Sequence, residues 1–176
     1  MKKISSRQLI PKILLALVVL SGAAVFAATN ETVSRALNLA RPEVKVEISG
    51  SVKRDDKNVS LEKAEAVKSG EILDWTINSA NEGAGDAKNY RVVGQIPKGT
   101  TFVAGSAKGE GTPQISYSID GGKSFSAQPL IEEKQADGSV KKVAAPASMF
   151  TQLRFEWEQS LPSQSKLTAA YRVRVK

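Results

Sequence analysis

The 176-residue sequence contains no cysteine and no histidine, and only 6% of its residues are aromatic. Without cysteine and histidine there can be no disulfide, no thiol nucleophile, no Ser-His-Asp triad and no ordinary zinc site. A protein without cysteine is also indifferent to the redox state of its compartment. These absences exclude several classes of enzyme and favour a scaffold or a binding domain.

The formal net charge is +7, which would ordinarily suggest nucleic acid or an anionic membrane as a partner. Four of the basic residues, Lys2, Lys3, Arg7 and Lys12, lie at the N-terminus, where residues 1–27 contain no acid. Removing these four leaves 21 basic and 18 acidic residues, a net charge of +3 over 149 residues. The remaining basic residues are interspersed with acids, so no nucleic-acid partner is expected.

Residues 1–27 have the pattern of a secretory signal peptide. A basic start is followed by an apolar run over 13–27, and Val25-Phe26-Ala27 fits the small-x-Ala rule for cleavage after Ala27. The apolar run is about 15 residues long, short of the roughly 20 that span a bilayer. We therefore predict an exported protein that is periplasmic, secreted or at the cell surface. The alternative is an uncleaved anchor, which would be its only contact with a membrane.

The rest of the chain divides into a lead-in and one domain. Residues 28–43 are predicted to be a linker or short helix, because Val33, Ala36, Leu37 and Ala40 share a helical face and Pro42 ends it. Residues 44–176 contain no second long apolar run and are predicted to form a single domain.

From Val44 onwards the dominant apolar period is two, which is typical of half-buried β-strands. Strands are expected over 44–48 and 73–77, and the clearest two are expected over 153–157 and 171–175. Two hairpins are expected, one over 115–126 and one over 130–143. Eight or nine short strands, frequent turn signals and no long helix predict an all-β antiparallel sandwich or Greek-key barrel.

Two expectations concern the end of the chain. If the strands over 153–157 and 171–175 pair, Glu156 and Glu158 would face Arg172 and Arg174. The last strand, Leu167 to Val175, is a candidate for an exposed sheet edge. The large residues expected in the core are Trp75, Tyr90, Phe102, Phe155, Trp157 and Tyr171.

The stretch from Gly70 to Gly83, with alternating apolar residues, one aromatic and a closing Asn81-Glu82-Gly83, resembles the opening of the bacterial conserved-repeat domain, domain of unknown function eleven. The resemblance covers about residues 60–176 and departs at Gly94, where the family often has an acidic residue. It implies an immunoglobulin-like sandwich in an exported protein, with no known catalytic residues and no cofactor. It continues through Ile96–Ser106, Tyr117–Phe125, Leu153–Trp157 and Tyr171–Val175.

The residues that carry this resemblance are also those that turns require. Asn81-Glu82-Gly83 suits a sharp turn with positive φ and side-chain-to-backbone hydrogen bonds. Pro97-Lys98-Gly99 suits a corner between strands, because proline cannot donate to a β-ladder. Asp120-Gly121-Gly122 suits a primed hairpin turn. We interpret these motifs as scaffold rather than as chemistry.

Two patterns could carry catalysis. The Ser-x-x-Lys strings Ser60–Lys63 and Ser163–Lys166 have the spacing that lets lysine activate serine on a helix, but they lack the companion motifs of serine acyl-enzymes. The pairs Glu132-Glu133 and Glu156/Glu158 have the residue type of glycoside hydrolysis, which needs a defined separation across a cleft. We interpret both patterns as solvated surface and expect no catalytic residues.

The patterns that could indicate metal or sugar sites are also weak. No loop has the alternating acids of an EF-hand, so no metal site is expected, although the Asp120 loop is the first choice for calcium over Asp55-Asp56 and Asp86. A carbohydrate platform needs two exposed coplanar aromatic residues, and Trp75, Phe155 and Trp157 lie on the apolar side of their strands. Phe125 and Phe150 are less constrained by the pattern.

These observations predict a non-enzymatic structural or protein-interaction domain of the cell envelope, with an envelope or surface protein as partner. It would present loops or a sheet edge to that partner. Two alternatives remain open: a carbohydrate or cell-wall binding module, and an accessory subunit of an envelope enzyme.

Overall fold

The computed structural model describes residues 41–64 and 66–176. The predicted signal peptide over 1–27 and its cleavage site at Ala27 lie outside the described residues, as do residues 28–40 of the predicted linker. Residues 41–43 have no regular secondary structure, and the first strand begins at Val44. None of the helices within the described residues has the length and hydrophobicity needed to cross a membrane.

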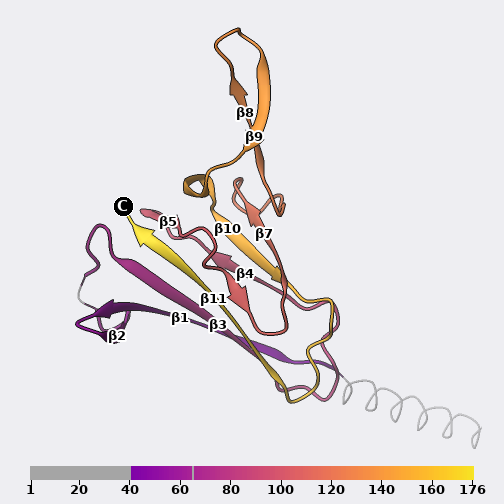
Figure 1. The fold of residues 1–176 in the computed structure, drawn as a ribbon. Coiled ribbons are helices and arrows are strands. Elements are labelled where there is room, and N and C mark those ends of the chain that lie inside the picture. The colour runs from indigo at the N-terminus through magenta and orange to yellow at the C-terminus, as the bar shows by residue number, and fades with distance from the viewer. Residues whose placement is uncertain (1–40, 65) are drawn as a thin grey trace, which may run out of the picture. The chain divides into compact units, whose positions relative to one another are not determined.

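The described residues form an all-β fold of antiparallel sheets, as predicted (Figure 1). Six strands make the larger sheet, with β2-β1-β3-β11-β5 in order and β6 also paired to β11. A second sheet has the order β4-β10-β7, and β8 and β9 pair only with each other. The strands are β1 (Val44–Arg54), β2 (Lys57–Ser60), β3 (Ile72–Asn81), β4 (Arg91–Gln95), β5 (Thr100–Phe102), β6 (Lys108–Gly109), β7 (Gln114–Ser118), β8 (Leu130–Lys134), β9 (Val140–Ala144), β10 (Gln152–Glu156) and β11 (Lys166–Val175); a 3₁₀ turn, η1, covers Ala147–Met149.

The six-stranded and three-stranded sheets share one hydrophobic core, as in a β-sandwich. Strands β3 and β11 contribute Leu73, Ile77 and Val173, while β10 contributes Leu153 and Phe155, all buried. Side chains of this size stabilise the fold by about 1.5–3 kcal/mol each when fully buried. The alternation seen in the sequence therefore marks the inward faces of β3, β10 and β11 correctly.

The predicted aromatic core is confirmed in the main. Phe102, Phe155, Trp157 and Tyr171 are buried, whereas Trp75 and Tyr90 are half-buried and packed against the core. The Tyr90 ring stacks on the Trp157 ring with centroids 5.6 Å apart. Aromatic pairs of this kind contribute about 0.5–1.5 kcal/mol beyond the area they bury.

The two expectations for the end of the chain are wrong. Strand β10 pairs with β4 and β7, while β11 pairs with β3 on one side and with β5 and β6 on the other, so the two belong to different sheets. Strand β11 is therefore an interior strand, and Leu167 to Val175 offer no free edge. Alternation fixes which face of a strand is buried, but it does not say which strand lies beside it.

Burial along β1 also differs from the prediction. Val44 is half-buried, but Val46 and Ile48 are 46% and 50% exposed. Val52 on the same face is only 1% exposed. The strand is present where the pattern places it, and the second sheet covers only part of its inward face.

One of the two predicted hairpins forms. Strands β8 and β9 pair from Leu130 opposite Ala144 to Lys134 opposite Val140. In the other segment, β7 pairs with β10, and only a single bridge joins Tyr117 to Ser126. The prediction of a second strand over Lys123–Ser126 is therefore wrong, because pairing on the side of β7 away from β10 is limited to this one bridge.

Candidate functional site

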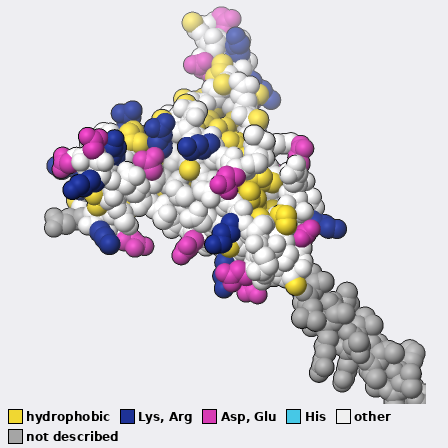
Figure 2. Space-filling view, turned by 60° about the horizontal axis from the view of Figure 1, so that its bottom comes forward, with side chains coloured by type: hydrophobic (Ala, Val, Ile, Leu, Met, Phe, Trp, Pro, Cys, Tyr) yellow, Lys and Arg dark blue, Asp and Glu magenta, His cyan; other side chains and the backbone are white. Residues whose placement is uncertain are grey.

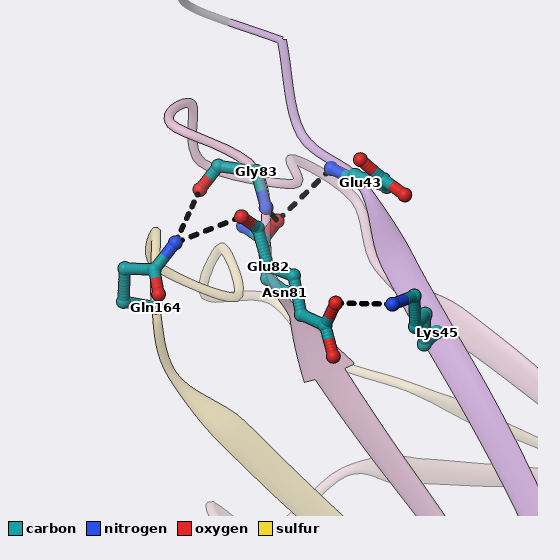
Figure 3. Close-up of polar contacts among 6 residues, drawn as sticks. All are labelled: Glu43, Lys45, Asn81, Glu82, Gly83 and Gln164. Carbon is teal, nitrogen blue, oxygen red and sulfur yellow. Dashed lines mark hydrogen bonds and ion pairs between the residues drawn. The ribbon is translucent and has the colours of Figure 1, made fainter.

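The predicted turn residue Asn81 joins several segments at the end of β3. Its side chain is buried, and its Nδ2 donates to the carbonyls of Gly85, Leu161 and Pro162 at 2.8, 3.1 and 3.2 Å. Its Oδ1 accepts from the backbone N–H of Glu43 at 3.1 Å and of Gly83 at 3.2 Å (Figure 3). The Asn81 junction thus ties the start of β1, the loop after β3 and the loop before β11 together.

The loop before β11 adds further hydrogen bonds to the Asn81 junction. Gln164 Nε2 donates to the carbonyls of Glu82 and Gly83 at 2.8 and 3.4 Å (Figure 3). Ser163 Oγ also donates to the Gly83 carbonyl, at 2.7 Å. Gly83 does not have a positive φ, so the left-handed turn predicted there is wrong. Hydrogen bonds from side chains, rather than a glycine conformation, hold this turn.

The other two turn motifs use glycine as predicted. Gly99 has a φ of +82°, and Thr100 donates to the Pro97 carbonyl through both its N–H and its hydroxyl, at 3.1 and 2.7 Å. Gly121 and Gly122 have φ values of +75° and +91°. Pro97 follows the end of β4 at Gln95, so the proline lies outside the ladder.

Asp120 organises its turn with both carboxylate oxygens. Its Oδ1 accepts from Ser118 Oγ at 2.7 Å and from Ser124 N at 3.0 Å, while Oδ2 accepts from Ser124 Oγ at 2.6 Å. The hydrogen bonds from Ser124 and Ser118 hold the pKa of this carboxyl well below its usual range. The group that was the first choice for calcium is thus engaged with hydroxyl and amide donors of its own loop.

A shallow hollow of about 760 Å³ lies beside the Asn81 junction. Its lining side chains come mainly from the outward face of the larger sheet, on β1, β3 and β11. Lys45 forms an ion pair with Glu82 at its rim, which raises the pKa of the Lys45 ammonium (Figure 3). The lining mixes charges of both signs with amide and hydroxyl groups: Lys45, Val46, Glu47, Asn78, Ser79, Ala80, Glu82, Lys166, Leu167 and Thr168.

The hairpin β8–β9 projects from the rest of the sandwich (Figure 1). Its register places Leu130, Lys134 and Val140 on one face, with Leu130 53% and Val140 63% exposed. Between them Glu132 lies opposite Lys142, and on the other face Glu133 lies opposite Lys141. Figure 2 shows hydrophobic, basic and acidic side chains together on this projection.

The hairpin is ordered at both ends. At its base the N–H of Ala145 donates to the Pro129 carbonyl at 2.8 Å, and Ala145 itself is buried. At its tip Gly138 has a φ of +84°, and Asp137 Oδ1 accepts from the N–H and hydroxyl of Ser139 at 2.9 and 2.7 Å. Those hydrogen bonds lower the pKa of Asp137. The projecting hairpin is thus held by hydrogen bonds at its base and has a defined turn at its tip.

The residues considered for catalysis are engaged in local structure. Ser60 and Ser163 take part in turns: Ser60 Oγ accepts from Glu62 N at 3.3 Å, and Ser163 N donates to Asp86 Oδ1 at 3.0 Å. Glu156 pairs with Arg154 at 3.2 Å, and Glu158 accepts from Gln114 at 2.8 Å. Glu132 and Glu133 lie on the hairpin opposite lysines. Across residues 41–64 and 66–176, histidine, cysteine, aspartate and glutamate side chains form no group of three suited to a metal.

Most of the aromatic residues that the structure describes lie in packed clusters. Phe102, Tyr117 and Phe150 contact one another with centroids 4.7 to 6.0 Å apart, and none of these described aromatics is exposed. Arg154 lies over the Phe125 ring, 4.8 Å from its centroid. Within the described part of the chain no aromatic pair forms the platform that a carbohydrate module needs. Carbohydrate binding stays a prediction without a site.

Sequence reasoning missed two ion pairs and the position of the hairpin. Lys45–Glu82 and Arg54–Glu71 join residues far apart in the sequence, with Arg54 Nε 2.9 Å from Glu71 Oε1. The hairpin itself was predicted, but not that it leaves the sandwich. A signal for that was present, since charged residues occupy both faces of β8 and β9 and a strand in a sandwich has one apolar face.

Comparison with protein-family models, with curated proteins and with solved structures found no match to this chain.

Proposed function

We propose that this protein is an exported, non-enzymatic protein-interaction module of the cell envelope, and that hairpin β8–β9 is the element that binds its partner. The observation that carries the proposal is the projection of this ordered ribbon, with Leu130 and Val140 exposed on one face. The partner surface would be apolar, with charges of both signs to meet Glu132 and Lys142.

The hairpin adds little to the core, and this supports a role in binding. An isolated two-stranded hairpin is marginally stable in water, and ordering each of its residues costs about 1–2 kcal/mol of backbone entropy. Its exposed Leu130 and Val140 recover little of that cost within the monomer. Exposed apolar side chains on a preorganised ribbon are what a protein partner can bury at a small further cost in entropy.

An immunoglobulin-like Greek-key topology is part of the proposal. Its support is the chain path, which crosses between the two sheets from β3 to β4, from β4 to β5, from β6 to β7 and from β10 to β11. The resemblance of residues 60–176 to the bacterial conserved-repeat domain supports the same topology and an exported location. Export is further supported by the basic and apolar pattern of residues 1–27.

Site-specific photo-crosslinking in intact cells tests the role of the hairpin. A photoreactive residue at Leu130 or Val140 is expected to give one discrete protein adduct, because both side chains point to solvent on the proposed face. The matched control is the same residue at Val67, which is 41% exposed and lies outside the hairpin. Equal adducts from all three positions, or none from the hairpin, would contradict the proposal.

The partner identified in this way is then tested with purified proteins. Leu130→Asp is expected to weaken binding by about tenfold or more, equivalent to about 1.4 kcal/mol. Glu133→Gln, on the opposite face of the same hairpin, is the matched control and should leave the dissociation constant nearly unchanged. N-terminal sequencing of the protein recovered from the cell envelope tests export, with Ala28 expected as the first residue.

A further inference from the structure

The outer side of strand β1 is an open sheet edge at one end. Strand β3 pairs with β1 from Val44 to Val52, but β2 pairs with it only from Ser51 to Arg54. Among the described residues no strand covers the other side of residues 44–49. This edge is separate from hairpin β8–β9, so a strand could bind it whether or not the hairpin has the proposed function.

The direction of the backbone groups on this edge follows from two hydrogen bonds. The Gly50 carbonyl accepts from Leu61 N on the outer side at 2.9 Å, and the Glu43 carbonyl accepts from Glu82 N on the side of β3 at 2.8 Å. Because the N–H and C=O groups of one residue point to the same side of a strand, and successive residues alternate, even-numbered residues point outward. The N–H and C=O groups of Val44, Val46 and Ile48 therefore face the open side.

The side chains make this edge apolar on one face and charged on the other. Val46 and Ile48 are about half exposed, on the face that carries Val52 into the core. Lys45 and Glu47 lie on the opposite face and are exposed (Figure 3 shows Lys45 there, paired with Glu82). An open edge with exposed apolar side chains is a template for pairing with another strand.

We propose that a second copy of this chain occupies the edge, with the two β1 strands antiparallel and Val46 opposite its own copy across a twofold axis. In this register Val44 lies opposite Ile48, and Lys45 lies opposite Glu47 on both sides of the axis. Residues whose N–H and C=O groups face the open side must pair with residues of the same kind in the second copy. Alternative registers therefore differ from this one by shifts of two residues.

Charge selects this register from its neighbours. Shifting one β1 strand by two residues along the other places Glu47 opposite Glu47. A two-residue shift in the other direction places Lys45 opposite Lys45. Like charges directly opposite each other are destabilising, whereas opposite charges contribute about 0.2–1 kcal/mol per pair. A further shift of two positions would bring Val46 opposite Gly50, whose carbonyl is already bonded to Leu61, or, in the other direction, opposite Pro42, which has no N–H to donate. The edge is thus self-complementary in one register, which is what a twofold interface requires.

Single cysteine variants of the full chain test both the dimer and its register, since the natural sequence contains no cysteine. In Val46→Cys the two thiols face each other, within the Cα separation of about 4.4–6.8 Å that a disulfide needs. In Ile48→Cys they are separated by four residue steps along the strand, or about 13 Å. Under mild oxidation in the cell envelope we expect about tenfold more linked dimer from Val46→Cys than from Ile48→Cys.

A charge swap provides the second measurement. Glu47→Lys alone and Lys45→Glu alone each place like charges across the axis, whereas a mixture of the two variants restores two Lys–Glu pairs. The mixed dimer is therefore expected to outnumber both single-variant dimers. Circular dichroism establishes that each variant is folded, which matters because Lys45 also pairs with Glu82. Equal crosslinking of Val46→Cys and Ile48→Cys, or no preference in the mixture, would overturn the proposal.

Discussion

The two halves of β1 have the same sequence pattern and opposite surroundings. At one end Val52 is 1% exposed, and at the other Val46, on the same face of the same strand, is 46% exposed. Beside Val52, the segment after β2 packs Leu61 and Ala64 against the core, and Leu61 also lies over Gly50. No such cover lies over Val46 among the described residues. Burial in this protein depends on the neighbouring layer, not on the period of the strand.

The two ends of the larger sheet are also held by different forces. The covered end relies on apolar contact, with Leu73 and Val173 both buried beside Val52. The open end relies on the Asn81 junction, where one buried amide joins five backbone groups. At the apolar end, a substitution that removes side-chain volume should destabilise the protein by leaving a cavity. At the polar end, a substitution that removes a hydrogen-bond partner should destabilise it by leaving polar groups unpaired. This contrast can be tested by substitutions in each half.

The largest expected difference is between Ile77 and Ile48, which lie directly opposite each other on β3 and β1. Ile77 is fully buried, so Ile77→Ala is expected to lower the free energy of unfolding by about 2–5 kcal/mol through lost burial and a cavity. Ile48 is 50% exposed, and Ile48→Ala should cost about 0.5 kcal/mol. Urea denaturation of both variants, at a protein concentration too low for association, checks the difference. Similar losses would show that the edge of β1 is covered after all.

The Asn81 junction comes next. Asn81→Ala removes the partner of five backbone groups, one of them on the buried Leu161 and the others partly buried, and is expected to destabilise the protein by about 2–3 kcal/mol. Asn78→Ala on the exposed outward face of the same strand is the control and should cost about 0.5 kcal/mol or less. Thermal unfolding compares the two. Equal melting temperatures would mean that water replaces the Asn81 amide without loss.

The sequence predicted where the strands lie along the chain better than it predicted which strands pair with one another. The period of two located β1, β3, β10 and β11, because alternation is imposed by one buried face. It could not place β10 and β11 in different sheets, since sheet order depends on contacts between distant segments. The turn glycines Gly99, Gly121 and Gly122 were predictable because positive φ is a local demand.

The candidate site was less predictable than the fold. The partners of Asn81 include Leu161 and Pro162, about eighty residues away, and no local pattern names them. The sequence suggested an interaction surface on a sheet edge but assigned it to Leu167–Val175, which lies in the interior. The free edge is on β1, because the short strand β2 pairs only with Ser51 to Arg54 of that strand.

A substitution at Gly94 tests the packing of β4 against Tyr171 of β11 in the larger sheet. A Cβ added there would lie 2.6 Å from Tyr171 Cε1 and 3.1 Å from Leu153 Cδ2, closer than normal packing allows. Gly94→Ala is therefore expected to push β4 away from β11 and to cost about 2 kcal/mol. Gly138→Ala, in open space with positive φ, should cost only about 1 kcal/mol. Chemical denaturation that ranks Gly138→Ala as the more damaging change would contradict this packing.

The smallest effect at neutral pH is expected for Tyr171, whose hydroxyl donates to the Gln95 carbonyl at 2.5 Å. Tyr171→Phe loses this hydrogen bond and should cost about 1 kcal/mol. Burial raises the pKa of Tyr171 from 10.0 to about 12, because the charged phenolate is disfavoured inside the core. The unfolded chain therefore ionises first, and the stability due to Tyr171 is present below pH 10 and is lost as the pH rises towards 12.

Denaturation measured at intervals between pH 8 and 12 separates this contribution from those of the other tyrosines. The native protein is expected to lose stability more steeply above pH 10 than Tyr171→Phe does, so the two curves converge as the pH rises. Burial also raises the pKa values of Tyr90 and Tyr117, and these two keep a weaker alkaline slope in the variant. Parallel curves over this range would mean that Tyr171 ionises alike in the folded and unfolded chains. That result would contradict the burial of Tyr171 between the two sheets. Convergence would instead support the packing of β4 against β11, where Tyr171 contacts Gln95 and Gly94.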